Sequence, residues 1–158
     1  MTNVLQVNPQ NCNGCLECEI ACVNRHLKIN NHGYSRIQII KSDGGGKFFL
    51  PTICQHCEDP PCKKVCEKGA IYRDDDLNRV VLDMNFCIGC RMCVSACPFG
   101  AVGFDSERGF AFKCDLCNGE PECVLACGLG ALEYLDGNIL NYTKMRESAN
   151  RHHAVSRH

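Results

Sequence analysis

The chain has 158 residues, a formal net charge of -1 and 16 cysteines, which are about one residue in ten. The length falls in the range of one domain, and this share of cysteine is typical of either a disulfide scaffold or a metal-rich protein. The scattered lysines and arginines form no basic stripe, which argues against nucleic acid as a partner. No apolar run approaches the 18 or so residues of a membrane helix, and residues 1–9 show no export signal. We therefore expect a cytoplasmic protein without direct membrane insertion.

The N-terminal part of the chain is predicted to begin with a strand. Residues 1–11 place a short apolar patch before the turn-forming pair Asn8 and Pro9, which predicts an edge strand that leads into a cysteine motif at residues 12–22. Residues 23–32, which follow this motif, are expected to form a short helix and a loop.

Apolar segments flank polar or glycine-rich turns at four further places, which predicts β-hairpins. The predicted strand pairs are residues 34–40 with 48–53, 70–72 with 79–84, 102–104 with 110–112, and 132–135 with 139–142. A helix of one or two turns is expected between the third and fourth cysteine of a motif, for example at residues 91–96. Residues 143–158 have little apolar content and are predicted to be a flexible or partner-docking tail.

The cysteines fall into four motifs, at residues 12–22, 54–66, 87–97 and 114–127. In the third motif the gaps are two, two and three residues and a proline follows, which is the spacing of bacterial iron-sulfur ferredoxins. The first motif has the same gaps, whereas the middle gap is four residues in the second motif and five in the fourth. With this spacing three thiolates bind one cluster and the fourth reaches a neighbouring cluster, so one such motif implies another.

The four motifs use every cysteine of the chain. They are Cys12, Cys15, Cys18, Cys22, Cys54, Cys57, Cys62, Cys66, Cys87, Cys90, Cys93, Cys97, Cys114, Cys117, Cys123 and Cys127. Three of the motifs are also followed by a glycine–alanine pair, at residues 69–70, 100–101 and 130–131, which indicates an internal repeat. The first motif lacks this pair, so either it ends differently or a helix begins there.

The spacing of the cysteines favours iron-sulfur clusters over its competitors. Soft thiolates at this density select zinc, copper(I) or iron-sulfur clusters, but a zinc site uses cysteine pairs separated by a longer loop. Disulfides need specific distances between paired residues, which four tight clusters of cysteine suit poorly. A zinc-binding interaction module stays a remote alternative. Four oxidised 4Fe-4S clusters with their thiolates would add roughly eight negative charges, so we expect an acidic holoprotein.

A few other side chains lie close in sequence to the predicted ligands. His56 lies between two cysteines and would raise a cluster potential if it donated a hydrogen bond toward the cluster, but a packed or exposed histidine is an equal alternative. Five cations flank ligands and would offset cluster charge or dock an acidic partner, although an ordinary solvated side chain is the simpler interpretation for each. These are Lys63, Lys64, Lys68, Arg91 and Lys113.

Three stretches of the chain resemble a known family. Residues 54–62, 87–93 and 113–117 are similar to the second, third and fourth motifs of the four-cluster ferredoxin subunits. That family includes the B subunits of dimethyl sulfoxide reductase and formate dehydrogenase, and small subunits that serve hydrogenases, carbon monoxide dehydrogenase and tungsten aldehyde oxidoreductases. The resemblance implies an α+β fold for residues 1–142, with two ferredoxin-like lobes of two 4Fe-4S clusters each, short helices and β-hairpins.

The resemblance also implies how the motifs combine, because in the family the first motif pairs with the fourth and the second with the third. The implied ligand sets are Cys12, Cys15, Cys18 and Cys127 for cluster A; Cys114, Cys117, Cys123 and Cys22 for cluster B; Cys54, Cys57, Cys62 and Cys97 for cluster C; and Cys87, Cys90, Cys93 and Cys66 for cluster D. The spacing alone leaves a second arrangement open, in which the first motif pairs with the second and the third with the fourth.

The predicted function is electron transfer, with no catalysis by this protein itself. Every expected cluster is fully ligated by cysteine, and the sequence contains no nucleotide-binding loop or nucleophile motif. We expect a large catalytic oxidoreductase subunit as partner, and a further electron-carrier subunit as a second one. A tungsten or molybdenum aldehyde oxidoreductase is the first choice for the catalytic partner, with formate dehydrogenase, carbon monoxide dehydrogenase and hydrogenase as alternatives.

Overall fold

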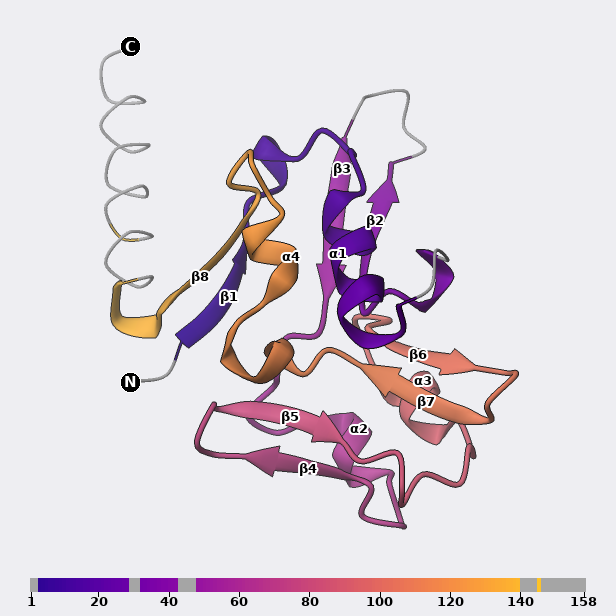
Figure 1. Ribbon diagram of the computed structural model, residues 1–158. Helices are drawn as coiled ribbons and strands as arrows, with labels where there is room; N and C mark the ends of the chain where they lie inside the picture. The colour runs from indigo at the N-terminus through magenta and orange to yellow at the C-terminus, as the bar shows by residue number, and fades with distance from the viewer. Residues whose placement is uncertain (1–2, 29–31, 43–47, 140–144, 146–158) are drawn as a thin grey trace.

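The computed structural model describes residues 3–28, 32–42, 48–139 and 145, and combines short strands with short helices (Figure 1). The strands are β1 (Asn3–Val7), β2 (Ile37–Lys41), β3 (Phe49–Ile53), β4 (Ile71–Asp74), β5 (Arg79–Leu82), β6 (Val102–Asp105), β7 (Phe110–Lys113) and β8 (Leu132–Asp136). The α-helices are α1 (Glu17–His26), α2 (Pro61–Lys64), α3 (Met92–Ala96) and α4 (Glu122–Leu125), and the 3-10 helices are η1 (Pro9–Asn11), η2 (His32–Tyr34) and η3 (Leu116–Gly119). The predicted mixture of helix and strand is confirmed.

Three of the four predicted hairpins are present. Strands β2 and β3, β4 and β5, and β6 and β7 each form a two-stranded antiparallel sheet. The predicted edge strand at the N-terminus is also confirmed, since β1 lies there and has a single neighbour among the described strands.

The fourth predicted hairpin, residues 132–135 with 139–142, is wrong. Strand β8 pairs with β1, with Val7 opposite Leu132 and Asn3 opposite Asp136, and residues 137–139 are helical. Residues 140–142 lie outside the described part of the chain. The pairing with β1 brings the apolar side chains of β1 against Leu132, which is buried, so burial of apolar surface outweighs the local turn signal at the end of β8.

The first helix begins earlier than the sequence suggested and carries two cysteines. Cys18 and Cys22 are four residues apart on α1 and therefore lie on one face of it, where both are buried. The other three motifs end at a left-handed glycine three residues after their last cysteine, namely Gly69, Gly100 and Gly130. The first motif has Arg25 at that position, so its helix continues to His26.

The described residues pack around two separate hydrophobic clusters. The first contains Ile37, Ile53 and Leu132 together with cysteines of the first and fourth motifs. The second contains Ile71, Val80 and cysteines of the second and third motifs. Helix α1 contacts α4, and α2 contacts α3, so segments far apart in the sequence lie side by side (Figure 1).

Two further sequence predictions concern a membrane helix and the C-terminal tail, and the described residues bear on them only in part. Among its helices, none is long and apolar enough to cross a membrane. The predicted tail, residues 143–158, lies outside the described residues except for Met145.

Candidate iron-sulfur sites

Each cysteine motif has the same local construction, a loop followed by a helix. The first two cysteines lie on the loop, except that Cys117 of the fourth motif lies in the 3-10 helix η3. The third cysteine lies in an α-helix, as Cys18 does in α1, Cys62 in α2, Cys93 in α3 and Cys123 in α4. The residue just before the second cysteine has a left-handed backbone in all four loops. These residues are Gly14, His56, Gly89 and Leu116, with φ of 77°, 46°, 71° and 55°.

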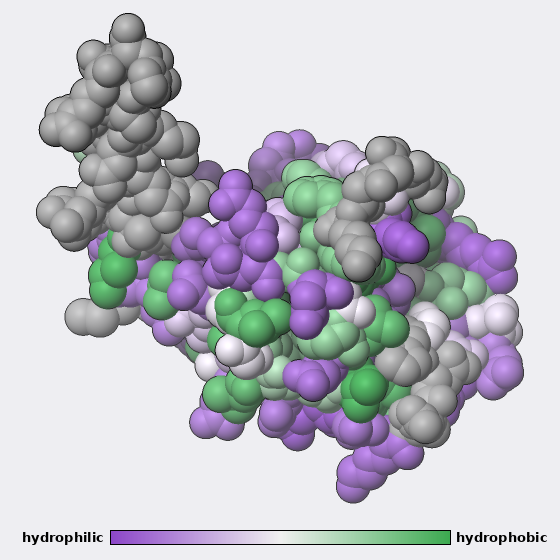
Figure 2. Space-filling model, turned by 90° about the horizontal axis from the view of Figure 1, so that it is seen from above, coloured by the Kyte–Doolittle hydropathy of each residue, from purple (hydrophilic) through white to green (hydrophobic). Residues whose placement is uncertain are grey.

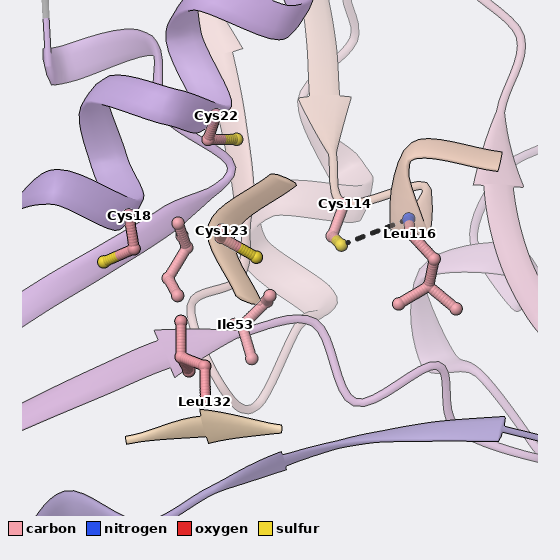
Figure 3. Close-up of a cluster of buried hydrophobic side chains, with 8 residues drawn as sticks. Cys18, Cys22, Ile53, Cys114, Leu116, Cys123 and Leu132 are labelled. Carbon is pink, nitrogen blue, oxygen red and sulfur yellow. Dashed lines mark hydrogen bonds between the residues drawn. The ribbon is translucent and has the colours of Figure 1, made fainter. Parts of the chain in front are cut away.

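Backbone N–H groups point at several of the thiols. Leu116 donates to Cys114 Sγ at 3.4 Å, as the dashed line in Figure 3 marks. Arg36 and Ala101 donate to Cys22 and Cys97 at 3.3 and 3.4 Å. Hydrogen bonds to sulfur favour the more negative state of a thiolate or cluster, so this backbone suits cluster ligation.

Four sets of cysteines come together, and each set combines two motifs. In Figure 3, the sulfur atoms of Cys22 on α1 and Cys123 on α4 point to the same side, whereas the sulfur of Cys18 on α1 points the opposite way. Electrostatic interactions between thiols give the members that lie near one another. They join Cys18 with Cys15 and Cys127, Cys62 with Cys54 and Cys97, Cys93 with Cys66, Cys87 and Cys90, and Cys123 with Cys22, Cys114 and Cys117. Interactions between the sets are also present, between Cys123 and Cys18 and between Cys114 and Cys54.

Two of these sets line cavities. A cavity of about 290 Å³ is bordered by all four cysteines of the first set, with Cys12 beside Cys15, Cys18 and Cys127. A second cavity, of about 220 Å³, is bordered by the cysteines of the third set. Thiols that surround a cavity are suited to chelation, because their sulfur atoms can approach one bound group together.

Burial disfavours the thiolate form of several cysteines when no positive charge is nearby. It raises the pKa of the Cys18 and Cys114 thiols to about 12 and that of Cys93 to about 11, and it also raises the pKa of Cys123. A thiolate in such surroundings needs compensating positive charge. Iron supplies that charge, so the donor set and its burial fit 4Fe-4S clusters.

The exposed cysteines lie in two of the four sets. Cys15 and Cys90 are exposed, whereas the other cysteines are buried or half-buried. Phe86, Ile88 and Met92 are exposed residues that line the cavity around Cys90. On the face seen in Figure 2, apolar surface (green) likewise lies among polar surface (purple).

His56 is half-buried, and its Nε2 atom is buried. Its Nδ1 accepts a hydrogen bond from the Val80 backbone N–H at 3.0 Å, while its buried Nε2 has no partner among the described residues. Burial and the Lys113 charge lower the pKa of His56 to about 3, so the ring is neutral and carries its proton on Nε2. The ring thus offers a buried N–H donor, which is compatible with the first of the two alternatives given for His56, a hydrogen bond toward a cluster.

The five predicted cations differ strongly in exposure. Lys63, Lys64 and Lys68 are exposed, and Lys64 forms an ion pair with Asp59. Arg91 lies over the Phe104 ring, 4.0 Å from its centroid. Lys113 is buried.

The sequence analysis missed an ion-pair network beside the fourth motif. Asp115 accepts from Arg36 at 2.7 Å and lies 3.5 Å from His26 Nε2, which is 3.8 Å from Cys117 Sγ. Burial and the Arg36 charge lower the pKa of His26. These residues come from segments far apart in the sequence, so no local pattern could have revealed the network.

Comparison with known proteins places this protein in a family. Residues 46–137 match the 4Fe-4S dicluster domain. An uncharacterized ferredoxin of Methanocaldococcus jannaschii is 42% identical over 139 residues, covering 87% of this chain and 75% of the relative. The B subunit of anaerobic dimethyl sulfoxide reductase from Escherichia coli is 35% identical, with 81% and 70% covered. The electron transport protein HydN of Escherichia coli is 34% identical, with 89% and 91% covered.

The match to the domain extends over more than half of the chain and includes three of the four cysteine motifs. The relatives cover more than four fifths of the chain. This protein therefore belongs to the 4Fe-4S dicluster domain family and is a ferredoxin-type iron-sulfur protein related to the electron-transfer subunits of oxidoreductases.

Proposed function

We propose that this protein is a non-catalytic electron-transfer subunit that holds four 4Fe-4S clusters between a catalytic oxidoreductase subunit and a second redox carrier. The observation that supports the proposal is that cysteines of the first motif lie near cysteines of the fourth, and cysteines of the second near cysteines of the third. When bound, a cluster of this kind takes up and releases one electron at a time. The protein contributes the ligands, their spacing and the surrounding charge.

The proposed ligand sets are those of clusters A to D. The proximity of Cys127 to Cys18 and of Cys22 to Cys123 supports pairing of the first motif with the fourth. The proximity of Cys97 to Cys62 and of Cys66 to Cys93 supports pairing of the second with the third. The contacts of α1 with α4 and of α2 with α3 support the same two pairings. The thiol proximities and the helix contacts together favour two ferredoxin-like lobes over the sequential arrangement.

The proposed order of the clusters is A, B, C and D. Cys114 of cluster B interacts electrostatically with Cys54 of cluster C, which supports a junction between B and C. The two exposed cysteines, Cys15 and Cys90, belong to clusters A and D. A row with accessible ends and a buried middle suits passage of electrons from one partner to another.

The proposed catalytic partner is a tungsten or molybdenum aldehyde oxidoreductase. Support for a catalytic partner in general comes from the dimethyl sulfoxide reductase relative, which is one subunit of a reductase. Formate dehydrogenase, carbon monoxide dehydrogenase and hydrogenase are the alternatives. Mass spectrometry of the large subunit that co-purifies with this protein separates these alternatives.

The cytoplasmic location of the protein stays a prediction.

The test replaces Cys57 or Cys90 by serine and compares two activities of the complex. The variant must first be shown to fold and to bind its large subunit. Activity with a small dye that reaches the partner's cofactor directly should survive, while activity with the physiological carrier should fall sharply. Equal loss of both activities would show that the cysteine supports structure or catalysis instead of electron passage.

A further inference from the structure

Lys113 is a buried cation that has no anionic side chain next to it. It is 3% exposed at the end of β7, and its ammonium donates to the backbone oxygens of Val80 and of Cys114, the latter at 3.1 Å. Within the described part of the chain no carboxylate lies within ion-pair distance of it. A buried charge with only carbonyl partners is costly unless another anion balances it.

The ammonium reaches both hydrophobic clusters, because it binds the backbone oxygen of Cys114, a member of the first cluster, and that of Val80, a member of the second. The Lys113 charge acts on Cys114, which belongs to the first hydrophobic cluster, and on Cys62, which belongs to the second. In the proposed ligand sets Cys114 holds cluster B and Cys62 holds cluster C. Lys113 therefore lies at the junction between these two clusters.

The other cations near ligands are not placed to do the same. Lys63, Lys64 and Lys68 are exposed, so water and salt screen their charges. Arg79, which is also near the junction, forms an ion pair with Asp74 at 2.8 Å. The charge of Lys113 is buried and is paired with no carboxylate of the described residues, so its field on nearby sulfur is the least screened.

We propose that the Lys113 ammonium is the counter-ion of the two junction clusters and raises their reduction potentials above those they would have without it. This inference rests on the proposed four-cluster function. Reduction adds one electron, and hence one negative charge, to a bound cluster and breaks no bond. A fixed cation nearby stabilises that added charge, so no proton has to accompany the electron.

The test is a potentiometric titration of the holoprotein under anaerobic conditions, followed by electron paramagnetic resonance. Lys113→Met removes the charge and keeps most of the side-chain length. At a fixed potential it should lower the ratio of reduced to oxidised cluster at least tenfold for a junction cluster, which is about 59 mV for a one-electron couple. Signals of the terminal clusters should keep their potentials. Cys62→Ser and Cys123→Ser identify the junction signals, and Cys18→Ser and Cys93→Ser identify the terminal ones.

Two further variants separate charge from structure. Lys113→Arg keeps the charge and should titrate close to the unsubstituted protein, whereas Lys113→Gln keeps an N–H donor without the charge and should behave like Lys113→Met. Lys41→Met is the matched control, because Lys41 is exposed at the end of β2 and is not adjacent in sequence to a cysteine. It should leave every potential unchanged.

The possible results separate failure of the counter-ion role from failure of the four-cluster function. Unchanged junction potentials in Lys113→Met and Lys113→Gln, with full iron content, overturn the counter-ion role and leave the four-cluster function standing. Loss of the junction clusters in both neutral variants but not in Lys113→Arg supports the role. Loss in all three variants overturns it, since shape alone would then explain the effect. Absence of 4Fe-4S signals in the unsubstituted protein overturns the proposed function itself.

Discussion

The shape of each cysteine loop depends on one residue with a left-handed backbone. Gly14 and Gly89 provide it in the first and third motifs, where the absence of a Cβ removes the steric cost. His56 and Leu116 occupy the same position in the second and fourth motifs despite that cost. The same left-handed conformation therefore precedes the second cysteine of every motif.

Gly89→Ala should damage the third motif. An added Cβ would lie 2.2 Å from the backbone oxygen of Gly109, at a φ of +71°, and the left-handed backbone alone costs roughly 1–2 kcal/mol for alanine. We expect a lower melting temperature and loss of iron from one cluster. Gly128→Ala is the control, because nothing lies within 4 Å of its added Cβ. Equal behaviour of the two variants would show that this loop tolerates a side chain.

Cys97→Ser tests the proposed pairing of motifs. Because Cys97 lies near Cys62, its replacement should change the same paramagnetic signal as Cys62→Ser does. The measurement compares the spectra of the reduced variants with that of Cys93→Ser, which marks the other cluster of the lobe. The pairing is wrong if the Cys97→Ser spectrum matches that of Cys123→Ser, as the sequential arrangement requires.

Arg79 links the elements on the two sides of the junction. From β5 it binds Asp74 on β4, and it donates to the backbone oxygen of Asp115 and to Asn118 Oδ1 at η3. Its side chain is only 12% exposed, so these bonds are partly shielded from water. The second hydrophobic cluster is thereby attached to the fourth motif.

Arg79→Met should loosen this attachment. Loss of hydrogen bonds from a charged donor, which leaves Asp74 without its partner, should lower the free energy of unfolding by about 1–3 kcal/mol. Lys64→Met is the control, because Lys64 and Asp59 are both exposed and such a pair is worth about 0–1 kcal/mol. Thermal unfolding of the holoproteins measures the difference. A loss for Arg79→Met no larger than for the control would exclude a structural role of this link.

The sequence predicts the elements whose signals are local and misses those that depend on distant partners. Three hairpins follow from turn residues between apolar segments, but the partner of β8 lies near the opposite terminus in β1, and no local pattern encodes that pairing. Cysteine spacing predicts the sites. It cannot show which of five neighbouring cations is buried, because the burial of Lys113 depends on packing against Val80 from another hairpin.

Cysteines make up a large part of both hydrophobic clusters of the whole molecule. In the first cluster they include Cys18, Cys22, Cys114 and Cys123, and in the second Cys62 and Cys93. Ligation therefore has to contribute much of the free energy that opposes the conformational entropy of the polypeptide.

Removal of iron should consequently collapse the structure. We expect the apoprotein to lose its native near-ultraviolet circular dichroism and its cooperative thermal transition, because structural metal binding is coupled to folding. Reconstitution with iron and sulfide should restore both. An apoprotein that kept native dichroism and a cooperative melt would show that the protein core is sufficient without clusters.

The central claim is that one polypeptide holds four redox-active 4Fe-4S clusters. The most direct measurement determines iron and acid-labile sulfide in anaerobically purified protein and counts the electrons taken up in a reductive titration. Four clusters predict about 16 irons, about 16 sulfides and about four electrons per polypeptide, with bleaching of the visible absorption. Colourless protein that contains zinc, or about half of this iron and electron uptake, would contradict the claim.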